Sequence, residues 1–221
     1  MHNTAHMIEA SYMTIKEMLA DRSLDVSSFD EVEELAVERV VERSQTTPIF
    51  ALDVPSCNLR VIYNLNPKYR SIDIKKVLNA PGQHPGITHA IILSRENPTT
   101  GTQPQGSQSD IASAQIKTIE NFRMADLCVN ISRHALQPKF EVLDEKDTQA
   151  LLVHHCIVNA RNKLPVIYSS DPMARYYHLK HGDVVRITRQ VPSGGTSIYY
   201  RCCHTHKPSS TSTAVIREQD A

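Results

Sequence analysis

The sequence predicts an α/β protein made of two domains, and three features of the 221-residue chain point to this class. Helical and strand-like segments alternate up to about Ile131. A short link then leads to a second set of helices and strands, which ends near His206. The chain is long enough to bury a core without disulfides, and its length fits one large domain or two small ones.

The first unit is expected to open with two helices. Apolar residues recur at helical spacing from Tyr12 to Leu19, with charged residues between them. The segment 27–44, "SSFDEVEELAVERVVERS", predicts a second helix. Ser28 and Glu31 have the spacing of a capping box, and the early acidic residues suit the positive end of a helix dipole.

Strands are expected next in the first unit. The β-rich runs 48–54 and 59–65 predict two strands, and 87–93 predicts a third, buried one. A short helix is expected over 71–79, a further helix over 116–122 and a strand over 126–131. Residues 97–109 contain no apolar side chain, which predicts a mobile loop.

The second unit is expected to follow the link 132–140. A helix is predicted over 144–156, and an edge strand over 164–167 because Pro165 cannot donate to a ladder. Asp171 is expected to cap a helix that has Pro172 in its first turn. Segments 183–189 and 196–203 predict a hairpin, and the tail after His206 is expected to be frayed.

Composition excludes several classes of protein. Twenty-four basic residues balance twenty-four acidic ones, so no net charge draws the chain to nucleic acid or to an anionic membrane. Residues 160–207 are nevertheless basic, with eight Lys and Arg against two Asp. Five irregularly spaced cysteines do not predict a disulfide framework, and no apolar run approaches the length of a membrane span. We therefore expect a soluble intracellular protein.

A nuclease-like arrangement is the first catalytic hypothesis. Asp53, together with Asp73 and Lys75, resembles the acidic and lysine pattern with which metal-dependent nucleases hold Mg²⁺ and a water molecule. Asp73 and Lys75 lie two residues apart on a predicted helix and point to different faces. The pattern favours solvated surface charges, and no catalytic residue is predicted.

Two groups of histidines and cysteines suggest metal binding. "CCHTH", residues 202–206, offers zinc-type ligands, yet adjacent strand residues point to opposite faces and cannot share one ion. This favours one half-buried inward cysteine and one outward cysteine. His178 and His181 lack a third ligand nearby and favour helix-end histidines. We therefore predict no metal and no cofactor.

The segment "LPVIYSSDPMARYYHLKHGDVVRITRQ...TSIYYRC" resembles a known family over about 40 residues. Its order and spacing are similar to the C-terminal domain of the fifth subunit shared by nuclear RNA polymerases I, II and III, a domain that also occurs alone as a small subunit of the archaeal polymerase. "TIKEMLADRSL" resembles the family's first helix, and "KTIENFRMADLCVNISRHALQPKF" resembles the last helix and strand of its N-terminal domain and the linker that follows.

The resemblance implies a non-catalytic, nuclear polymerase subunit of two domains. An N-terminal restriction-endonuclease-like α/β jaw domain, residues 1–133, would lie near downstream DNA. A small C-terminal α+β assembly domain, residues 134–206, would dock on the largest subunit and contact neighbouring subunits, and residues 207–221 would be a disordered tail. No membrane is implied. The predicted partner-binding residues are Asp171, Pro172, Arg175, Tyr176, Tyr177, Lys180, Gly182 and Arg201.

The two tyrosines leave an alternative open, since Tyr176 can pack inward against Val184 and Ile198 while Tyr177 alone faces outward. His178 occupies the family's glycine position, which predicts a strained left-handed residue.

Other departures from the family lie elsewhere in the chain. Ile111, Ala112, Ser113 and Ala114 stand where the family has a Thr-Pro-Ser-Ala turn near DNA. Pro138, Lys139 and Phe140 close the linker where a histidine is usual. These departures suit a divergent copy used by one polymerase, such as a nucleolar polymerase-I-specific subunit acting in ribosomal RNA transcription. The remaining alternatives are a DNA-modifying nuclease of the same fold and a free adaptor module.

Overall fold

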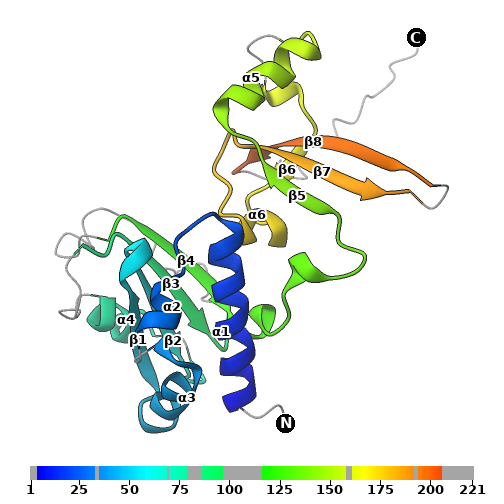
Figure 1. Cartoon of the computed structure of the whole chain (residues 1–221). Helices are drawn as coiled ribbons and strands as arrows, with labels where there is room; N and C mark the ends of the chain where they lie inside the picture. Colours follow the sequence, from blue (N-terminus) through cyan, green and yellow to red (C-terminus); the bar gives the residue numbers. More distant parts are fainter. Residues whose placement is uncertain are drawn as a thin grey trace, which may run out of the picture. The chain divides into compact units, whose positions relative to one another are not determined.

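A computed structural model describes residues 4–32, 35–68, 70–78, 86–96, 116–157, 161–191 and 194–205. The chain divides into two compact units, Met1–Asn130 and Ile131–Ala221, and the described residues of each form one four-stranded sheet. Helices accompany both sheets, which confirms the α/β class (Figure 1). No helix among the described residues is long and apolar enough to cross a membrane. The predicted loop 97–109, the turn 111–114 and the tail 207–221 lie outside the described residues.

The sheet of the first unit confirms three predicted strands. It has the order β1 (Ile49–Val54), β2 (Leu59–Asn64), β3 (His89–Ser94) and β4 (Thr118–Arg123). β1 runs antiparallel to β2, whereas β2, β3 and β4 are parallel to one another. Every residue of β2 is buried, which is typical of a central strand covered on both faces.

The described part of the first unit has four α-helices: α1 (Thr4–Asp21), α2 (Ser28–Glu31), α3 (Val37–Thr46) and α4 (Ser71–Leu78). α1 buries Ile8, Ile15 and Leu19, as its helical period predicts. The expected helix over 71–79 is also confirmed, and its Ile74 packs with Ile62 of β2 in one apolar cluster.

The expected single helix over 27–44 is wrong, because extended backbone at Val32 ends α2 before α3 begins. The predicted capping box is wrong as well. The Ser28 hydroxyl accepts a hydrogen bond from the Ser56 N–H at 3.0 Å, instead of capping its own helix. Short polar side chains bind nearby backbone groups readily, and here the partner is distant in sequence.

Two further predictions in the first unit are wrong. Residues 116–122 were expected to be helical, yet Thr118–Arg123 form β4, which pairs with β3. The open edge of β3 supplies the backbone partners that decide between helix and strand. The strand expected over 126–131 is replaced by 3₁₀ turns. The 3₁₀ turns among the described residues include η2 (Pro55–Cys57), η3 (Met124–Leu127), η4 (Ile131–Arg133) and η5 (Arg161–Lys163).

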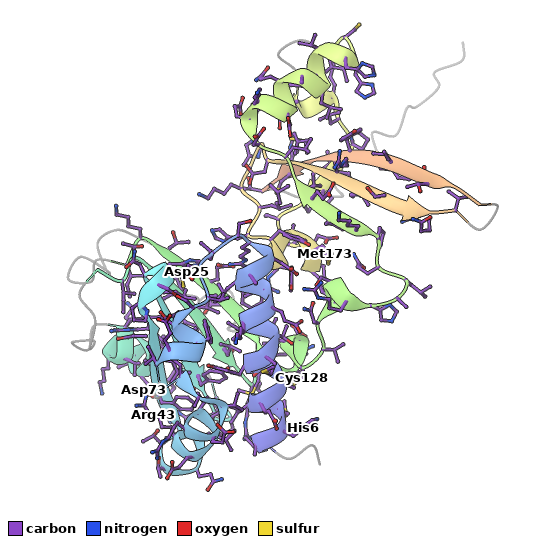
Figure 2. The ribbon with its side chains drawn as sticks, viewed as in Figure 1. His6, Asp25, Arg43, Asp73, Cys128 and Met173 are labelled. Atoms are coloured by element: carbon purple, nitrogen blue, oxygen red, sulfur yellow. The ribbon has the colours of Figure 1, made fainter. Side chains whose placement is uncertain are left out.

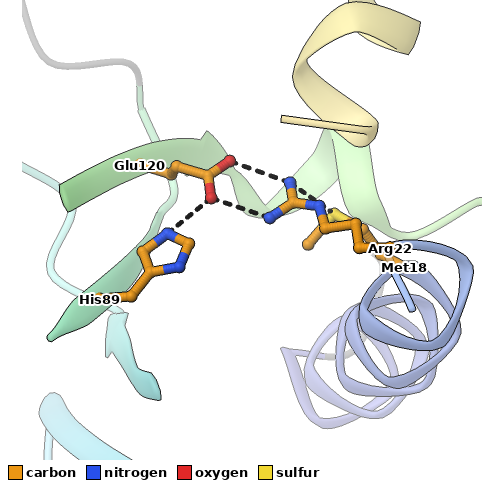
Figure 3. Close-up of polar contacts among 4 residues, drawn as sticks. All are labelled: Met18, Arg22, His89 and Glu120. Carbon is orange, nitrogen blue, oxygen red and sulfur yellow. Dashed lines mark hydrogen bonds and ion pairs between the residues drawn. The ribbon is translucent and has the colours of Figure 1, made fainter. Parts of the chain in front are cut away.

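Glu120 of β4 joins three elements of the first unit (Figure 3). Arg22, just beyond α1, donates to both carboxylate oxygens of Glu120 at 2.8 and 2.9 Å. The Nε2 atom of His89, in β3, lies 2.7 Å from Glu120 Oε1. The side chains of Arg22 and Glu120 are almost fully buried, so this network fixes the end of α1 against the sheet.

The second unit has the sheet order β5 (Lys139–Val142), β7 (Val184–Gln190), β8 (Thr196–His204) and β6 (Val166–Tyr168). β5 and β8 run antiparallel to β7, and the short edge strand β6 runs parallel to β8. The helices are α5 (Glu145–His154) and α6 (Pro172–Tyr176). The predicted hairpin, edge strand and two helices are confirmed.

Each face of the second sheet carries its own apolar cluster. On one face, Leu152 of α5 clusters with Val184 and Cys202. On the other face, Ala174 of α6 clusters with Cys203. Both cysteines are therefore buried, and the expectation of one outward cysteine is wrong because helices cover the sheet on both sides.

Candidate partner-binding surface

The helix α6 is positioned by its first two residues. The Asp171 carboxylate accepts a hydrogen bond from the Met173 N–H at 2.9 Å, and Pro172 occupies the first turn, where no N–H is needed. Both predictions for this helix start are confirmed. Met173 lies on α6 and is buried with Ala174 (Figure 2).

The adjacent tyrosines at the end of α6 have different surroundings. Tyr176 is 1% exposed, and its hydroxyl accepts a hydrogen bond from the Ser132 hydroxyl at 3.2 Å. Tyr177 is half-buried and stacks on Phe140, with ring centroids 6.3 Å apart. The alternative in which Tyr176 packs inward is confirmed by its burial, but its expected contact with Val184 is wrong, because Val184 clusters with α5 on the opposite face of the sheet.

Two left-handed residues shape the turn between α6 and β7. His178 has φ 52°, as predicted from its place at a family glycine position, and Gly182 has φ 92°. The Asp183 carboxylate accepts a hydrogen bond from the Lys180 N–H at 2.7 Å, so it closes the turn. Lys180 keeps its side chain exposed.

A groove of about 590 Å³ opens on the α6 side of the second sheet. Its floor is apolar and includes Phe140 and Ile187, which belong to the cluster under α6. Strand, helix and link residues complete the lining: Ile131, Gln137, Pro138, Ile167, Asp171, Pro172, Met173, Arg189, Tyr199 and Arg201. A groove of this kind can hold an extended polypeptide segment.

The rim of this groove is basic. Arg189 and Arg201 are exposed, and the Arg189 guanidinium lies 6.0 Å from the centroid of the Tyr199 ring. Arg201 donates through Nη1 to the Val166 carbonyl at 3.2 Å. This hydrogen bond holds the Arg201 guanidinium beside the first residue of β6. The nearby acid, Asp171, already accepts the cap hydrogen bond of α6. The groove therefore favours an acidic partner.

Glu141 of β5 is engaged within its own sheet. It lies 2.8 Å from Lys139 Nζ and accepts a hydrogen bond from Arg186 Nε at 2.6 Å. These two contacts hold the pKa of the Glu141 carboxyl below its usual range. Arg186 is thus paired with Glu141, whereas the exposed Arg189 and Arg201 can contact an acidic partner at the groove.

The structure brings only part of the predicted surface together. Asp171, Pro172 and Arg201 line the groove, whereas Arg175, Tyr177, Lys180 and Gly182 lie outside its lining. Sequence reasoning missed Phe140, Arg189 and Tyr199. Alternation along β7 and β8 was the available signal, because Arg189, Tyr199 and Arg201 occupy strand positions that face one side of the sheet.

The nuclease-like arrangement is not assembled among the described residues of the first unit. Asp53 accepts hydrogen bonds from Arg60 with both carboxylate oxygens, Nε to Oδ1 at 2.6 Å and Nη2 to Oδ2 at 3.0 Å. Asp73 lies on α4 (Figure 2). Asp53 is therefore committed to a buried ion pair and is not available as a metal ligand in this arrangement.

The two adjacent cysteines also lack the features of a zinc site. Cys202 and Cys203 belong to clusters on opposite faces of the sheet, as strand alternation predicts. Burial raises the pKa of both thiols, that of Cys203 to about 11, which is typical of unreactive structural cysteines. His181 instead contacts His204, with ring centroids 5.0 Å apart.

Comparison with known proteins identifies the family. A family model described as RNA polymerase Rpb5, C-terminal domain, matches residues 129–203. The Dictyostelium discoideum protein named DNA-directed RNA polymerases I, II, and III subunit rpabc1 is 32% identical over 193 residues, which cover 86% of this chain and 93% of the relative. The chain belongs to the Rpb5 family.

Other relatives in the Rpb5 family are similar over most of their length. The Caenorhabditis elegans subunit RPABC1 of polymerases I, II and III is 33% identical, and 74% of this chain and 75% of the relative are covered. Subunit 5B of polymerases IV and V from Arabidopsis thaliana is 31% identical, with 89% of each chain covered. The segment that matches the Rpb5 C-terminal model contains the whole lining of the groove.

Proposed function

We propose that this Rpb5-family chain is a non-catalytic subunit of a nuclear DNA-directed RNA polymerase and that its second unit docks on the largest subunit. The observation that carries the proposal is the groove with an apolar floor and an exposed arginine rim within the matched segment. Exposed arginines and partly buried aromatic residues are common at the centres of protein interfaces. The chain would support transcription without an active site of its own.

The first unit would form part of the lower jaw near downstream DNA. Its acidic amino-terminal segment makes a broad DNA-binding face unfavourable there, so any contact would be local. The proposed DNA-proximal residues are Ile111, Ala112, Ser113 and Ala114. The named relatives belong to polymerases I, II and III and to polymerases IV and V. A copy restricted to polymerase I in the nucleolus is the second candidate, favoured by His178 at the family's glycine position.

Affinity purification of the tagged full chain tests this proposal. We expect the largest polymerase subunit and its neighbours to co-purify in near-equal amounts. Arg189→Ala and Arg201→Ala, at the rim of the groove, should lower their recovery, whereas Arg39→Ala, at an exposed position of α3 in the first unit, should not. A tagged chain that recovers no polymerase subunit would show that the assignment is wrong. Identification of the recovered largest subunit also decides between the shared and the polymerase-I-specific candidates.

A nuclease assay tests the alternative that the chain is a DNA-modifying nuclease of the same fold. The purified chain is incubated with DNA and Mg²⁺, and we expect no cleavage. Cleavage that is lost in Asp53→Ala, in a variant that remains folded, would favour a nuclease instead.

A further inference from the structure

The strand β8 has an edge that its own sheet covers only in part. β8 pairs with β7 along seven residues, from Thr196 to Cys202. On its other side, β6 pairs only with Cys202, Cys203 and His204. Among the described residues, no strand lies alongside 196–201 on that side (Figure 1). Uncovered strand edges are sites where another chain can add a strand.

The hydrogen-bond pattern shows which backbone groups point to this edge. The Val191 N–H donates to the Gly195 carbonyl at 3.0 Å, and the Cys203 N–H donates to the Asp183 carbonyl at 2.8 Å. In an antiparallel pair such contacts alternate along the strand, so residues 197, 199 and 201 direct their N–H and C=O groups toward β7. Residues 196, 198 and 200 therefore direct theirs to the uncovered side.

A contact at the end of the edge supports this assignment. The Cys202 N–H, next in the same alternating series, donates away from β7 to the Pro165 carbonyl at 2.8 Å. The backbone groups of Ile198 and Tyr200 continue this line beyond β6. An added strand would extend the position of β6 along β8 and would find its hydrogen-bond partners at these two residues.

The two faces at this edge differ in chemistry. Tyr199 and Arg201 point to the groove side, where Arg189 is also exposed. Ile198 and Tyr200 point to the opposite side. Ile198 is 52% exposed and Tyr199 is 51% exposed, so neither face of the strand is covered here. The groove side favours acidic side chains, and the Ile198 side favours apolar ones.

We propose that an extended segment of a polymerase partner subunit, with alternating acidic and apolar residues, adds to the sheet at the β8 edge, residues 196–200. Its backbone pairs with Ile198 and Tyr200, its acidic side chains face Arg189 and Arg201, and its apolar side chains pack beside Ile198. The identity of the partner as a polymerase subunit rests on the proposed function. A second copy of this chain fits less well, because pairing of two β8 edges would bring two arginine-lined faces together.

Peptide binding to the full-length chain tests the recognition directly. The probe is a fluorescein-labelled peptide, acetyl-Glu-Val-Glu-Val-Glu-Val-Glu amide, measured by fluorescence anisotropy. We expect saturable binding that weakens by at least about tenfold when each Glu is replaced by Lys, or when Arg201→Glu is introduced into the chain. Absence of binding, or equal binding of the Glu and Lys peptides, would overturn the proposal.

N-methylated peptides separate backbone pairing from side-chain attraction. In an added strand, the amides of the Glu residues all point to one side and those of the Val residues to the other. Methylation of only one of these two sets should therefore abolish binding. Loss of binding with both sets, or with neither, would contradict strand addition. This measurement uses the unmodified chain and does not depend on any variant.

A proline variant tests the edge within the chain. Ile198→Pro removes an N–H that points away from β7, so the β7–β8 ladder keeps its hydrogen bonds. The matched control, Ile198→Ala, trims the side chain and keeps the N–H. We expect Ile198→Pro to weaken peptide binding by at least about tenfold more than Ile198→Ala. Equal losses in the two variants would show that the side chain, not the edge, is responsible.

Co-purification of the same variants connects the edge to the polymerase. The Ile198→Pro chain should recover less polymerase than the Ile198→Ala chain. If the unmodified chain recovers no polymerase, the proposed function is wrong. The peptide measurements then still decide whether an extended segment adds to β8 at its uncovered edge. If the unmodified chain recovers polymerase and Ile198→Pro recovers it equally, the edge proposal alone is wrong. A dimer in sedimentation that Ile198→Pro dissociates would also overturn it.

Discussion

Asp53 and Arg60 lie directly opposite each other on the antiparallel strands β1 and β2 and form a two-pronged ion pair. The side chains are only 10% and 6% exposed. Arg60 also donates through Nη1 to the carbonyls of Val77 and Leu78, at the end of α4. One guanidinium therefore joins two strands and satisfies the last carbonyls of a helix. Asp53, which resembled a nuclease carboxylate in the sequence, holds this guanidinium in place.

Asp53→Ala should destabilise the first unit strongly. Removal of one partner from a buried ion pair leaves the other charge buried and uncompensated, which costs about 3–5 kcal/mol. Urea unfolding of the full chain should show this loss in the transition of the first unit.

The Arg39–Glu42 pair supplies the control for this experiment. Its side chains are 55% and 67% exposed, with the atoms 3.2 Å apart. Glu42→Ala should change the free energy of unfolding by only about 0–0.5 kcal/mol, because solvent screens an exposed pair. Similar losses for Asp53→Ala and Glu42→Ala would contradict a structural role for the buried pair.

Local sequence signals predicted much of the fold. The alternation of β1, the apolar run of β3 and the Asp171–Pro172 start of α6 each depend on residues within one segment. The failures depend on distant partners. β4 became a strand because β3 lies beside it, and Ser28 bonds to Ser56 rather than to its own helix. Periodicity in a short segment does not contain that information.

The candidate surface was predicted less completely than the fold. The motif around Asp171 indicated the right segment of the chain, and Arg201 does line the groove. The groove also needs Phe140 from β5 and Arg189 from β7, which become neighbours only when the sheet forms. Tyr176 was counted as a surface residue, but the structure buries it. Adjacent helical residues point in different directions, and tertiary packing decides which one is covered.

Gly182→Ala should destabilise the second unit through its backbone. Gly182 has φ 92°, and a Cβ atom at this position would meet nothing within 4 Å. The cost therefore comes from the conformation itself, about 1–2 kcal/mol for a residue with a side chain. Thermal unfolding should show a lower midpoint.

Lys180→Ala is the matched control, because Lys180 lies two residues away and its side chain is exposed. Its effect should stay within about 0.5 kcal/mol. An unchanged midpoint in Gly182→Ala would mean that the turn relaxes to a conformation that alanine can adopt.

Glu141 should make the stability of the second unit depend on pH. Its hydrogen bonds to Lys139 and Arg186 lower the pKa of the carboxyl from its ordinary value of 4.5 in the folded state, and unfolding removes them. The folded state therefore gains stability above the ordinary pKa and loses it as pH falls through the lowered one.

The Glu141–Arg186 pair is partly exposed, so the gain in stability from the charged Glu141 is at most about 1 kcal/mol. Glu141→Gln should be less stable than the unmodified chain at pH 7, and the difference should vanish at a pH below the lowered pKa, where the Glu141 carboxyl is protonated in the folded state as well. Urea unfolding at both pH values measures this difference, which about 1 M NaCl should reduce at pH 7. A difference that persists unchanged at the lower pH would show that glutamine disturbs the packing of β5 against β7, rather than removing a charge.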